Sequence, residues 1–262
     1  MRIGVFDSGV GGITVLTALR ERIPEAEYVY LGDTANVPYG TKSPAQVIRL
    51  SLECARRLKQ SNVDALVVAC NTASSLANDA LRAEMGAIPV FGVVEPGVQA
   101  VVEVAEARSS SVLTPVLVLA TRATIRSGAY GRALRERLDP VKFPVFEQAC
   151  PILVPMIEEG WIEHRLLREA VEEYVAPFRA KYPSGVALLG CTHYPWIQPA
   201  IEAALPGWTV VNSARALGRS LESRFPNAGR KGQPAGALEW IFTDPEALPE
   251  FARQFIKDVT YA

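Results

Sequence analysis

Two of the four cysteines occupy matching positions in the sequence. Cys70 lies in the segment LVVACNT of residues 66–72, and Cys191 lies in ALLGCTH of residues 187–193. Each sulfur is therefore expected just after a buried strand, at the end of the sheet where open α/β folds bind their ligands. A single free cysteine is most often a small buried hydrophobe. Two cysteines in equivalent contexts favour a functional pair instead.

A pair of thiols can support three kinds of chemistry. A redox disulfide usually uses neighbouring cysteines, whereas these two are far apart in the sequence. Nucleophilic catalysis needs only one thiol. Racemisation needs two groups, because one must remove the α-proton from one face of the substrate while the other returns a proton to the opposite face. The pair therefore favours racemisation, with one sulfur starting as a thiolate and the other as a thiol.

The α-proton of an amino acid is a much weaker acid than a thiol, whose ordinary pKa is about 8.5. The site must therefore stabilise a carbanion. Asn71, Thr72 and Thr192 can donate hydrogen bonds to the substrate carboxylate. Asp7 and His193 are candidates to assist the two thiols, one on each side. We also expect each cysteine near a helix N-terminus, where the helix dipole would lower the pKa of the thiol.

Other motifs in the chain have simpler interpretations. Cys54 falls on the apolar stripe of a helix and Cys150 precedes Pro151 in a turn, so both are expected to pack in the core. The sequence DSGVGG at residues 7–12 lacks the lysine of a phosphate-binding loop and predicts a tight turn from strand to helix. With no CxxC pair and only two histidines, no metal site is expected.

The bulk composition excludes several classes of function. The chain has 262 residues, of which 49% are hydrophobic, and a formal net charge of −1. This length allows one large α/β domain or two smaller ones. The balanced charge offers no basic surface for nucleic acid, and no apolar run reaches the ~18–20 residues that span a bilayer. The first residues do not resemble a secretory signal, so we expect a cytoplasmic protein with reduced thiols.

Apolar strands and amphipathic helices alternate along the chain, which predicts an α/β fold with parallel sheets. The strands are expected at residues 3–6, 28–31, 65–69, 90–94, 115–120, 141–146, 186–190 and 209–211. The helices are expected at residues 14–22, after Ser43-Pro44, and near residues 125–137, 164–180 and 196–204.

The similarity between the two cysteine segments favours two open sheets over one barrel. We expect two pseudo-symmetric domains, each with a central, mostly parallel sheet flanked by helices, and an active site in the cleft between them. Residues 1–95 together with 213–262 would form the first domain, and residues 96–212 the second. The chain would cross between them at residues 95–97 and 212–213.

The C-terminal region is expected to return to the first domain. Asp244-Pro245 predicts the start of a helix whose apolar face carries Leu248, Phe251, Phe255 and Val259. Residues 227–236 are rich in glycine and polar residues and predict a surface loop.

Taken together, four motifs resemble the signatures of the bacterial glutamate racemase family. They are DSGVGG at residues 7–12, DTANVPYG at 33–40, ACNTAS at 69–74 and GCTHYP at 190–195. Residues 121–130 also resemble the family's threonine-rich loop, and residues 150–160 its Cys-Pro…Glu-Glu-Gly segment. The resemblance covers essentially the whole chain and is loosest after Asn212.

This resemblance implies that glutamate binds between the two domains and that its L and D forms are interconverted without a metal or pyridoxal phosphate. It implies a supply of D-glutamate for peptidoglycan. Cys70 and Cys191 are implied as the acid–base pair, and the groups implied to assist them are Asp7, Glu158 and His193. The residues implied to bind the substrate are Asp7, Ser8, Pro38, Tyr39, Gly40, Asn71, Thr72, Thr121, Thr124, Thr192 and His193.

Some implications are less specific. Glu158 follows from the resemblance alone, and its neighbour Glu159 is an alternative. Arg122 departs from the family pattern, which has a small residue or proline there, so its side chain either alters the substrate loop or points to solvent. A homodimer is also implied.

Three other functions remain open at this stage. A related racemase acting on aspartate or a hydantoin-type substrate would use the same two thiols. A binding protein with two α/β lobes could hold an amino acid without turnover. Some members of the family restrain DNA gyrase, but this chain has no N-terminal extension or basic patch to support that function.

Overall fold

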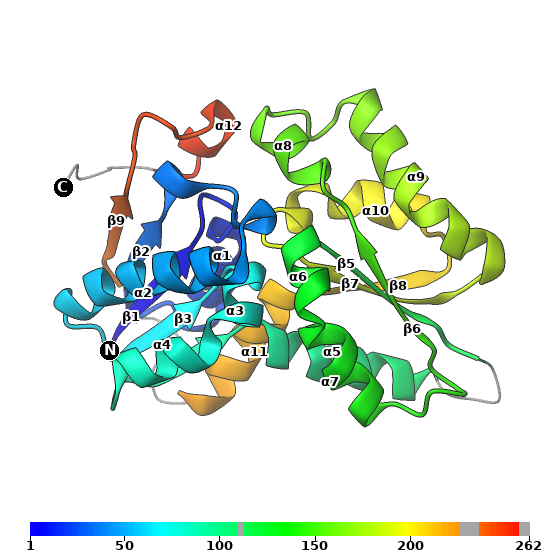
Figure 1. Cartoon of the computed structure of the whole chain (residues 1–262), viewed down its shortest axis with the longest axis horizontal. Coiled ribbons are helices and arrows are strands. Elements are labelled where there is room, and N and C mark those ends of the chain that lie inside the picture. The colour runs from blue at the N-terminus through cyan, green and yellow to red at the C-terminus, as the bar shows by residue number, and fades with distance from the viewer. Residues whose placement is uncertain (109–112, 226–235, 257–262) are drawn as a thin grey trace.

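Two parallel sheets form the framework of the chain, shown side by side in Figure 1. In this computed structural model, residues 1–108, 113–225 and 236–256 are described. The first sheet contains β1 (Arg2–Asp7), β2 (Glu27–Gly32), β3 (Ala65–Val68), β4 (Val90–Gly92) and β9 (Leu238–Phe242). The second contains β5 (Val116–Ala120), β6 (Val145–Ala149), β7 (Gly185–Gly190) and β8 (Trp208–Asn212).

Helices cover these sheets and connect their strands. Those that precede β5 in the chain are α1 (Ile13–Arg22), α2 (Pro44–Gln60), α3 (Asn71–Leu76), α4 (Asn78–Met85) and α5 (Val94–Ala107). The others are α6 (Arg122–Ser127), α7 (Ala129–Arg137), α8 (Leu153–Glu158), α9 (Arg165–Lys181), α10 (Gln198–Ala204), α11 (Ser213–Arg224) and α12 (Glu250–Arg253). Short 3-10 turns are η1 (Thr34–Asn36), η2 (Tyr39–Thr41) and η3 (Tyr194–Ile197).

The two sheets have the same topology. Their strand orders are β4-β3-β1-β2-β9 and β6-β5-β7-β8, and every strand pair is parallel. If β9 is left aside, β1 to β4 correspond to β5 to β8 in sequence order and in spatial order. Each sheet therefore reverses its direction of winding once, between β1 and β3 in the first and between β5 and β7 in the second. Such a switch point leaves a crevice at the carboxyl ends of the strands.

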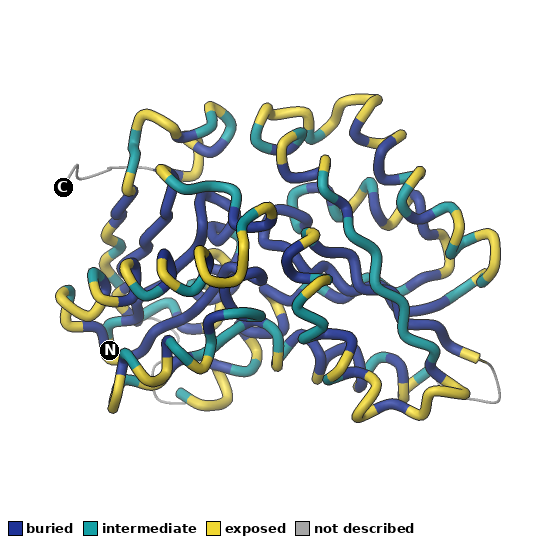
Figure 2. Tube along the Cα trace, in the orientation of Figure 1, coloured by how far each residue is buried: buried dark blue, intermediate teal, exposed yellow. Residues whose placement is uncertain are grey.

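Both faces of each sheet are buried, as a fully parallel sheet requires. In β2, Tyr28 and Tyr30 pack with α1 and α11 on one face, while Val29 and Leu31 pack with α2 on the other. β5 alternates in the same way between the two clusters of the second sheet. Figure 2 shows most of the strands as buried, with the edge strand β6 only half-buried, and the outer sides of the helices as exposed. The two-sheet α/β fold predicted from the sequence is thus confirmed.

Several helix boundaries follow from local chemistry. Ser43 caps α2, because its Oγ accepts a hydrogen bond from the Gln46 amide while the Gln46 side chain accepts one from the Ser43 amide. Pro44 occupies the first helical position, where a missing N–H has no cost. The segment expected to be helical near residues 125–137 is divided into α6 and α7 by Gly128, which adopts a left-handed conformation (φ 65°).

The strand predicted at residues 141–146 is wrong by about four residues. The Val141 amide donates a hydrogen bond to the side chain of Asp139, and the Phe143 amide donates one to the backbone carbonyl of Asp139. A turn therefore continues through these positions. Val141 is 78% exposed. Pairing with β5 begins only at Val145, beyond Pro144, which has no N–H to donate.

The segments expected as crossings at residues 95–97 and 212–213 begin helices. β4 ends at Gly92, and α5 starts at Val94 with Pro96 in its first turn, where proline is tolerated. Asn212 caps α11, its Oδ1 accepting from the Ala214 and Arg215 amides at 3.0 and 3.2 Å. Helices α5 and α11 pack against each other. The domain boundaries placed here from the sequence stay a prediction.

The C-terminal region differs most from expectation. The sequence did not predict β9, which pairs in parallel with β2 at the edge of the first sheet. The helix expected from Asp244-Pro245 is wrong, because α12 begins only at Glu250, after Pro249. A proline disfavours helical geometry in the residue before it, so no helix runs through Pro249 from Asp244. Val259 and residues 227–235 of the expected loop lie outside the described residues.

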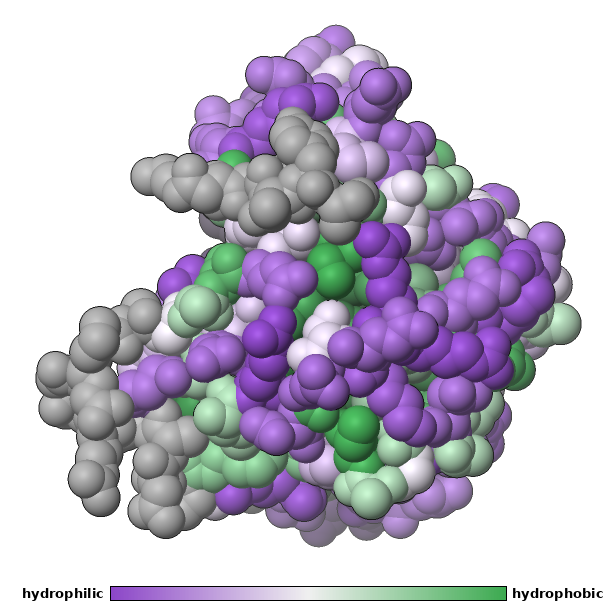
Figure 3. Space-filling model, turned by 90° about the vertical axis from the view of Figure 1, so that its left-hand side faces the viewer, coloured by the Kyte–Doolittle hydropathy of each residue, from purple (hydrophilic) through white to green (hydrophobic). Residues whose placement is uncertain are grey.

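The surface is largely polar. On the side that carries β9 and the C-terminal end, hydrophilic residues predominate and apolar ones show in small areas among them (Figure 3). In the described part of the chain, no helix combines the length and apolar character needed to cross a membrane.

Candidate active site

A cavity lies where the carboxyl ends of the central strands of both sheets meet. Its walls include Cys70, two residues after β3, Thr121, which directly follows β5, and Cys191, which directly follows β7. The full lining is Ser8, Val37, Pro38, Tyr39, Gly40, Thr41, Cys70, Asn71, Thr72, Thr121, Arg122, Cys150, Pro151, Val154, Pro155, Cys191, Thr192 and His193. Both switch points therefore open onto one cavity, and each contributes a thiol.

The first sheet with the helices packed on it is here called the first half, and the second sheet with its helices the second half. Cys70 is a buried thiol on the cavity wall that belongs to the first half. It is the N-cap residue of α3, and its Sγ lies 3.5 Å from Ser8 Oγ. Burial raises the pKa of Cys70 to about 12, and the negative charge of Asp7 adds to this. The expectation that the helix dipole would lower this pKa is wrong, because desolvation of the thiolate outweighs the hydrogen bonds from Ser8 and the Ala73 amide.

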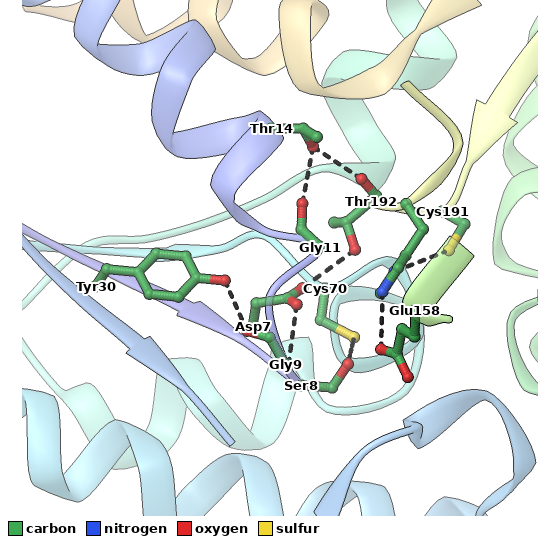
Figure 4. Close-up of polar contacts among 11 residues, drawn as sticks. Asp7, Ser8, Gly9, Gly11, Thr14, Tyr30, Cys70, Glu158, Cys191 and Thr192 are labelled. Carbon is green, nitrogen blue, oxygen red and sulfur yellow. Dashed lines mark hydrogen bonds and ion pairs between the residues drawn. The ribbon is translucent and has the colours of Figure 1, made fainter. Parts of the chain in front are cut away.

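Cys191 faces the same cavity from the second half. A turn follows it and leads into η3, so the helix that begins near Cys191 is a short 3-10 helix. Cys191 Sγ lies 3.9 Å from His193 Nδ1, and His193 Nε2 lies 3.0 Å from Glu158 Oε1. Figure 4 shows Cys191 and Glu158 among the polar contacts of the site. The imidazole therefore connects the thiol to a carboxylate at the end of α8.

His193 carries a strongly perturbed pKa. Burial disfavours its charged form, but the hydrogen bonds to Cys191 and Glu158 outweigh burial and raise the pKa to about 10. The buried imidazole is thus protonated at neutral pH. Its positive charge lies next to the Cys191 sulfur, where it stabilises negative charge. Glu159 is exposed, so the contact with His193 is made by Glu158, the first of the two alternatives.

Asp7 lies behind the cavity wall rather than on it. It is fully buried; its Oδ2 accepts from the Gly9 amide at 3.0 Å and its Oδ1 accepts from Thr192 Oγ1 at 3.4 Å. Burial raises its pKa, and the nearby His193 opposes that rise. The carboxyl group therefore links the loop after β1 in the first half to the turn after β7 in the second (Figure 4).

The glycines of residues 7–12 allow the two halves to approach. A β-carbon on Gly11 would overlap Thr192 and lie 2.5 Å from His193 Nδ1, and one on Gly12 would lie 2.5 Å from Asp7 Cβ. On the same contact, Thr14 Oγ1 lies 2.9 Å from the Thr192 carbonyl oxygen. The turn predicted from the sequence is present, and its lack of side chains lets α1 begin against the loop that carries Cys191.

Three threonine hydroxyls join the halves on another wall of the cavity. Thr72 Oγ1 lies 3.1 Å from Thr121 Oγ1 and 3.0 Å from Thr124 Oγ1, and the latter two are 3.0 Å apart. Thr72 and Thr121 line the cavity, whereas Thr124 does not. Thr124 positions the other two through its hydrogen bonds to both hydroxyls. A β-carbon on Gly40 would lie 2.7 Å from Thr121 Cβ, so the loop before α2 also closes against α6.

Asn71, which lines the cavity, has a side-chain donor without a partner among the described residues. Its Oδ1 accepts a 2.6 Å hydrogen bond from the Tyr130 hydroxyl of α7. Its Nδ2 is buried and has no hydrogen-bond partner within the described structure. A buried donor without a partner costs about 1–3 kcal/mol, and a ligand acceptor in the cavity would remove that cost.

Asp33 holds the loop that carries Pro38, Tyr39 and Gly40. Its Oδ2 accepts from the Tyr39 hydroxyl at 2.6 Å, and its Oδ1 accepts from Thr243 Oγ1 at 2.7 Å. Because Thr243 directly follows β9, the C-terminal edge strand helps to position this wall. No local sequence pattern connects residue 243 with the site, because the contact depends on the pairing of β9 with β2.

Most site residues expected from the sequence line the cavity, and the structure adds others. Asp7, Thr124 and Glu158 support it from behind. The sequence reasoning did not place on the wall Val37, Thr41, Cys150, Pro151, Val154 and Pro155. Cys150 is buried as expected, yet it also lines the cavity. Among the described residues, no group of three or more His, Cys, Asp or Glu side chains could hold a metal ion.

The Gly11 contact predicts a stability effect. Gly11→Ala forces a methyl group against Thr192 and His193, so it should lower the free energy of unfolding by about 2 kcal/mol or more. Urea denaturation measures this loss. Thr17→Ala, on the exposed side of α1, should change stability by less than about 0.5 kcal/mol. Equal stability of Gly11→Ala and the unaltered protein would contradict the close approach.

The raised pKa of His193 predicts a pH-dependent contribution to stability. The contribution is fully present below the unfolded-state pKa of about 6.5 and is lost as pH rises toward about 10. The unaltered protein should therefore exceed Glu158→Gln in unfolding free energy at pH 6, with a difference that shrinks toward pH 10. Glu159→Gln is the matched control and should show no such difference. A difference that grows with pH would refute the His193–Glu158 interaction.

Comparison with known proteins identifies the family of this chain. The family model described as Asp/Glu/Hydantoin racemase matches residues 14–221. The glutamate racemase of Aquifex aeolicus is 46% identical over 93% of this chain and 89% of its own length.

Solved structures agree over the whole fold. That of glutamate racemase from Francisella tularensis in complex with D-glutamate has a TM-score of 0.85 at 31% identity and covers 99% of this chain and 95% of that one. The Aquifex pyrophilus glutamate racemase has a TM-score of 0.77 at 42% identity, covering 100% and 98%. From the family match and these relatives, the chain belongs to the Asp/Glu/hydantoin racemase family.

Proposed function

We propose that this protein interconverts L- and D-glutamate, with Cys70 and Cys191 exchanging the α-proton from opposite faces and no metal or organic cofactor taking part. The observation that carries the proposal is the position of the two thiols. They follow equivalent strands of two sheets with the same topology and face one cavity. Two acid–base groups on opposite walls are what inversion at a carbon requires.

In each direction one sulfur begins as a thiolate and the other as a thiol. The thiolate takes the α-proton, and the electron pair of the broken C–H bond remains on the substrate as a carbanion. The opposite thiol then donates its proton to the other face and becomes the thiolate. The reverse direction exchanges these roles, so one cavity serves both enantiomers.

The surroundings of the two sulfurs provide the basicity that this step needs. The raised pKa of Cys70 makes its thiolate a stronger base than an ordinary one. The substrate ammonium group brings a positive charge into the cavity, which favours the thiolate there. On the other wall, the imidazolium of His193, held by Glu158, stabilises negative charge on Cys191.

Donors around the cavity would bind the substrate carboxylates and the developing negative charge. The unpartnered Nδ2 of Asn71 is the clearest of these. The hydroxyls of Ser8, Thr72 and Thr192 also lie on the wall. Because these groups are fixed before substrate arrives, they need little reorganisation in the transition state.

The choice of glutamate rests on the relatives that carry this activity in their names. An aspartate or hydantoin-type substrate is the second candidate, and comparison of racemisation rates across these compounds separates them. D-glutamate formed here would supply peptidoglycan synthesis. We include in the proposal a cytoplasmic location and a homodimer, the latter to be checked by light scattering of the purified protein.

The two-thiol scheme is tested by solvent exchange. Either enantiomer of glutamate is incubated in D₂O with metal-stripped protein, and deuterium at the α-carbon and optical rotation are followed. The unaltered protein should incorporate deuterium with inversion. Cys70→Ala and Cys191→Ala should each lower racemisation by at least about a thousandfold, since each removes one obligatory acid–base group. Exchange of a single enantiomer without inversion is expected from the thiol that remains.

Cys150→Ala is the matched control, because Cys150 is a buried thiol on the same cavity wall but takes no proton in this scheme. It should keep racemisation within about tenfold of the unaltered protein. Full racemisation by either Cys70→Ala or Cys191→Ala would refute the scheme. Tight binding of glutamate without any deuterium incorporation would instead favour a binding protein.

The Asn71 donor predicts a binding effect. Asn71→Ala should lower kcat/KM by roughly 10- to 100-fold, the effect of losing one hydrogen bond to a charged group. Tyr130→Phe leaves the Asn71 donor in place and removes only the hydrogen bond that orients it. The decrease in kcat/KM should therefore be smaller than in Asn71→Ala. Steady-state racemisation assays measure both. A larger loss in Tyr130→Phe than in Asn71→Ala would contradict the assignment.

A further inference from the structure

Arg122 is the one permanently charged side chain among the residues that line the cavity. No aspartate or glutamate is present in that lining, since Asp7 and Glu158 lie behind the wall. Arg122 is the first residue of α6 and directly follows Thr121. Its side chain is exposed, so it reaches the cavity from the solvent side.

The position of Arg122 is fixed by the elements that meet at Thr121. Gly40 packs against Thr121, so the loop that ends in Thr41 closes on the start of α6. Pro151 and Pro155 lie on the same cavity. Arg122 thus lines the cavity together with the loop before α2 and the segment around α8, on a side that is exposed to solvent.

The charge of Arg122 is not neutralised by a neighbour. Other arginines nearby form ion pairs, such as Arg135 with Glu147 at 3.1 Å and Arg137 with Glu95 at 2.8 Å. Within the described residues, Arg122 has neither an ion pair nor a hydrogen bond from its side chain. A free cation at the mouth of a low-dielectric cavity produces a positive potential that extends into the cavity and the adjacent solvent.

We propose that Arg122 helps to draw amino acids with a second carboxylate to the cavity through the positive potential that it produces there. The inference rests on the proposed function. Of the zwitterionic amino acids, those with a carboxylate side chain carry a net charge of −1 and gain from the potential at the mouth. Neutral amino acids gain nothing. Arg122 thus adds to the binding of the substrate while the two thiols carry out the proton transfer.

The experiment compares Arg122→Gln and Arg122→Glu with Arg126→Gln. Arg126 is exposed on the same helix but does not line the cavity, so it controls for the loss of one positive charge from the protein. Steady-state racemisation of L-glutamate and D-glutamate is measured at about 20 mM and about 300 mM salt, which changes the screening length several-fold.

Arg122→Gln should lower kcat/KM by about two- to fourfold at low salt, through a higher KM, with kcat nearly unchanged. Arg122→Glu should show roughly the square of that effect. Both should approach the unaltered protein at high salt. Arg122→Lys keeps the charge and should restore kcat/KM. Arg126→Gln should behave like the unaltered protein at both salt concentrations.

Equal kinetics of Arg122→Gln and Arg126→Gln would overturn the inference, as would an effect that persists undiminished at high salt or falls on kcat alone. These outcomes leave the proposed function intact as long as the unaltered protein racemises glutamate. An unaltered protein that fails to do so would overturn the proposed function, and the inference with it.

Discussion

The close approach of the loop after β1 to the turn after β7 is the contact on which the rest of the site depends. It is possible because Gly11 has no side chain where Thr192 and His193 come to lie. The hydrogen bond from Thr192 to Asp7 and the contact of Thr14 with the Thr192 carbonyl fix the same junction. Each sheet alone would present one thiol at its switch point, and this junction, together with the threonine contacts across the cavity, makes them face a common cavity.

Bringing the halves together also buries the charged groups, and burial sets the electrostatics of the site. Desolvation raises the pKa of Cys70 and of Asp7, and it opposes the charging of His193. His193 is nevertheless protonated because Cys191 and Glu158 both lie against its ring nitrogens. The two thiols therefore have unlike surroundings although their strands are equivalent: a hydroxyl and a carboxyl group near Cys70, an imidazolium next to Cys191.

The supporting contacts come from distant parts of the chain. Thr72 meets Thr121 and Thr124 across the cavity, and Tyr130 of α7 orients Asn71 of α3. Asp33 connects the loop of Tyr39 to Thr243 beyond β9. On the outer side, Trp196 packs edge-to-face on His193 at 5.6 Å and on Phe251 at 5.0 Å, so the short α12 lies against the back of the site. These contacts support the cavity wall from outside the lining.

The α/β class and the matching positions of Cys70 and Cys191 could be inferred from local sequence patterns, whereas most of the cavity wall was implied only by the family resemblance. Apolar runs that end in small polar residues are local patterns, and parallel strands bring their carboxyl ends to one edge wherever they pair. The sequence by itself did not determine the parts that depend on long-range packing. No strand was expected at β9 and no helix at α5 or α11, and the strand β6 was expected about four residues too early. Val154 and Pro155 belong to no motif that marks them as cavity residues.

The expected fall in the pKa of Cys70 was wrong for the same reason. A helix dipole can be inferred from local sequence, whereas desolvation depends on how completely the second half covers the first. Only the tertiary structure decided which charges are buried together, because burial is a property of the assembled halves and not of any one segment.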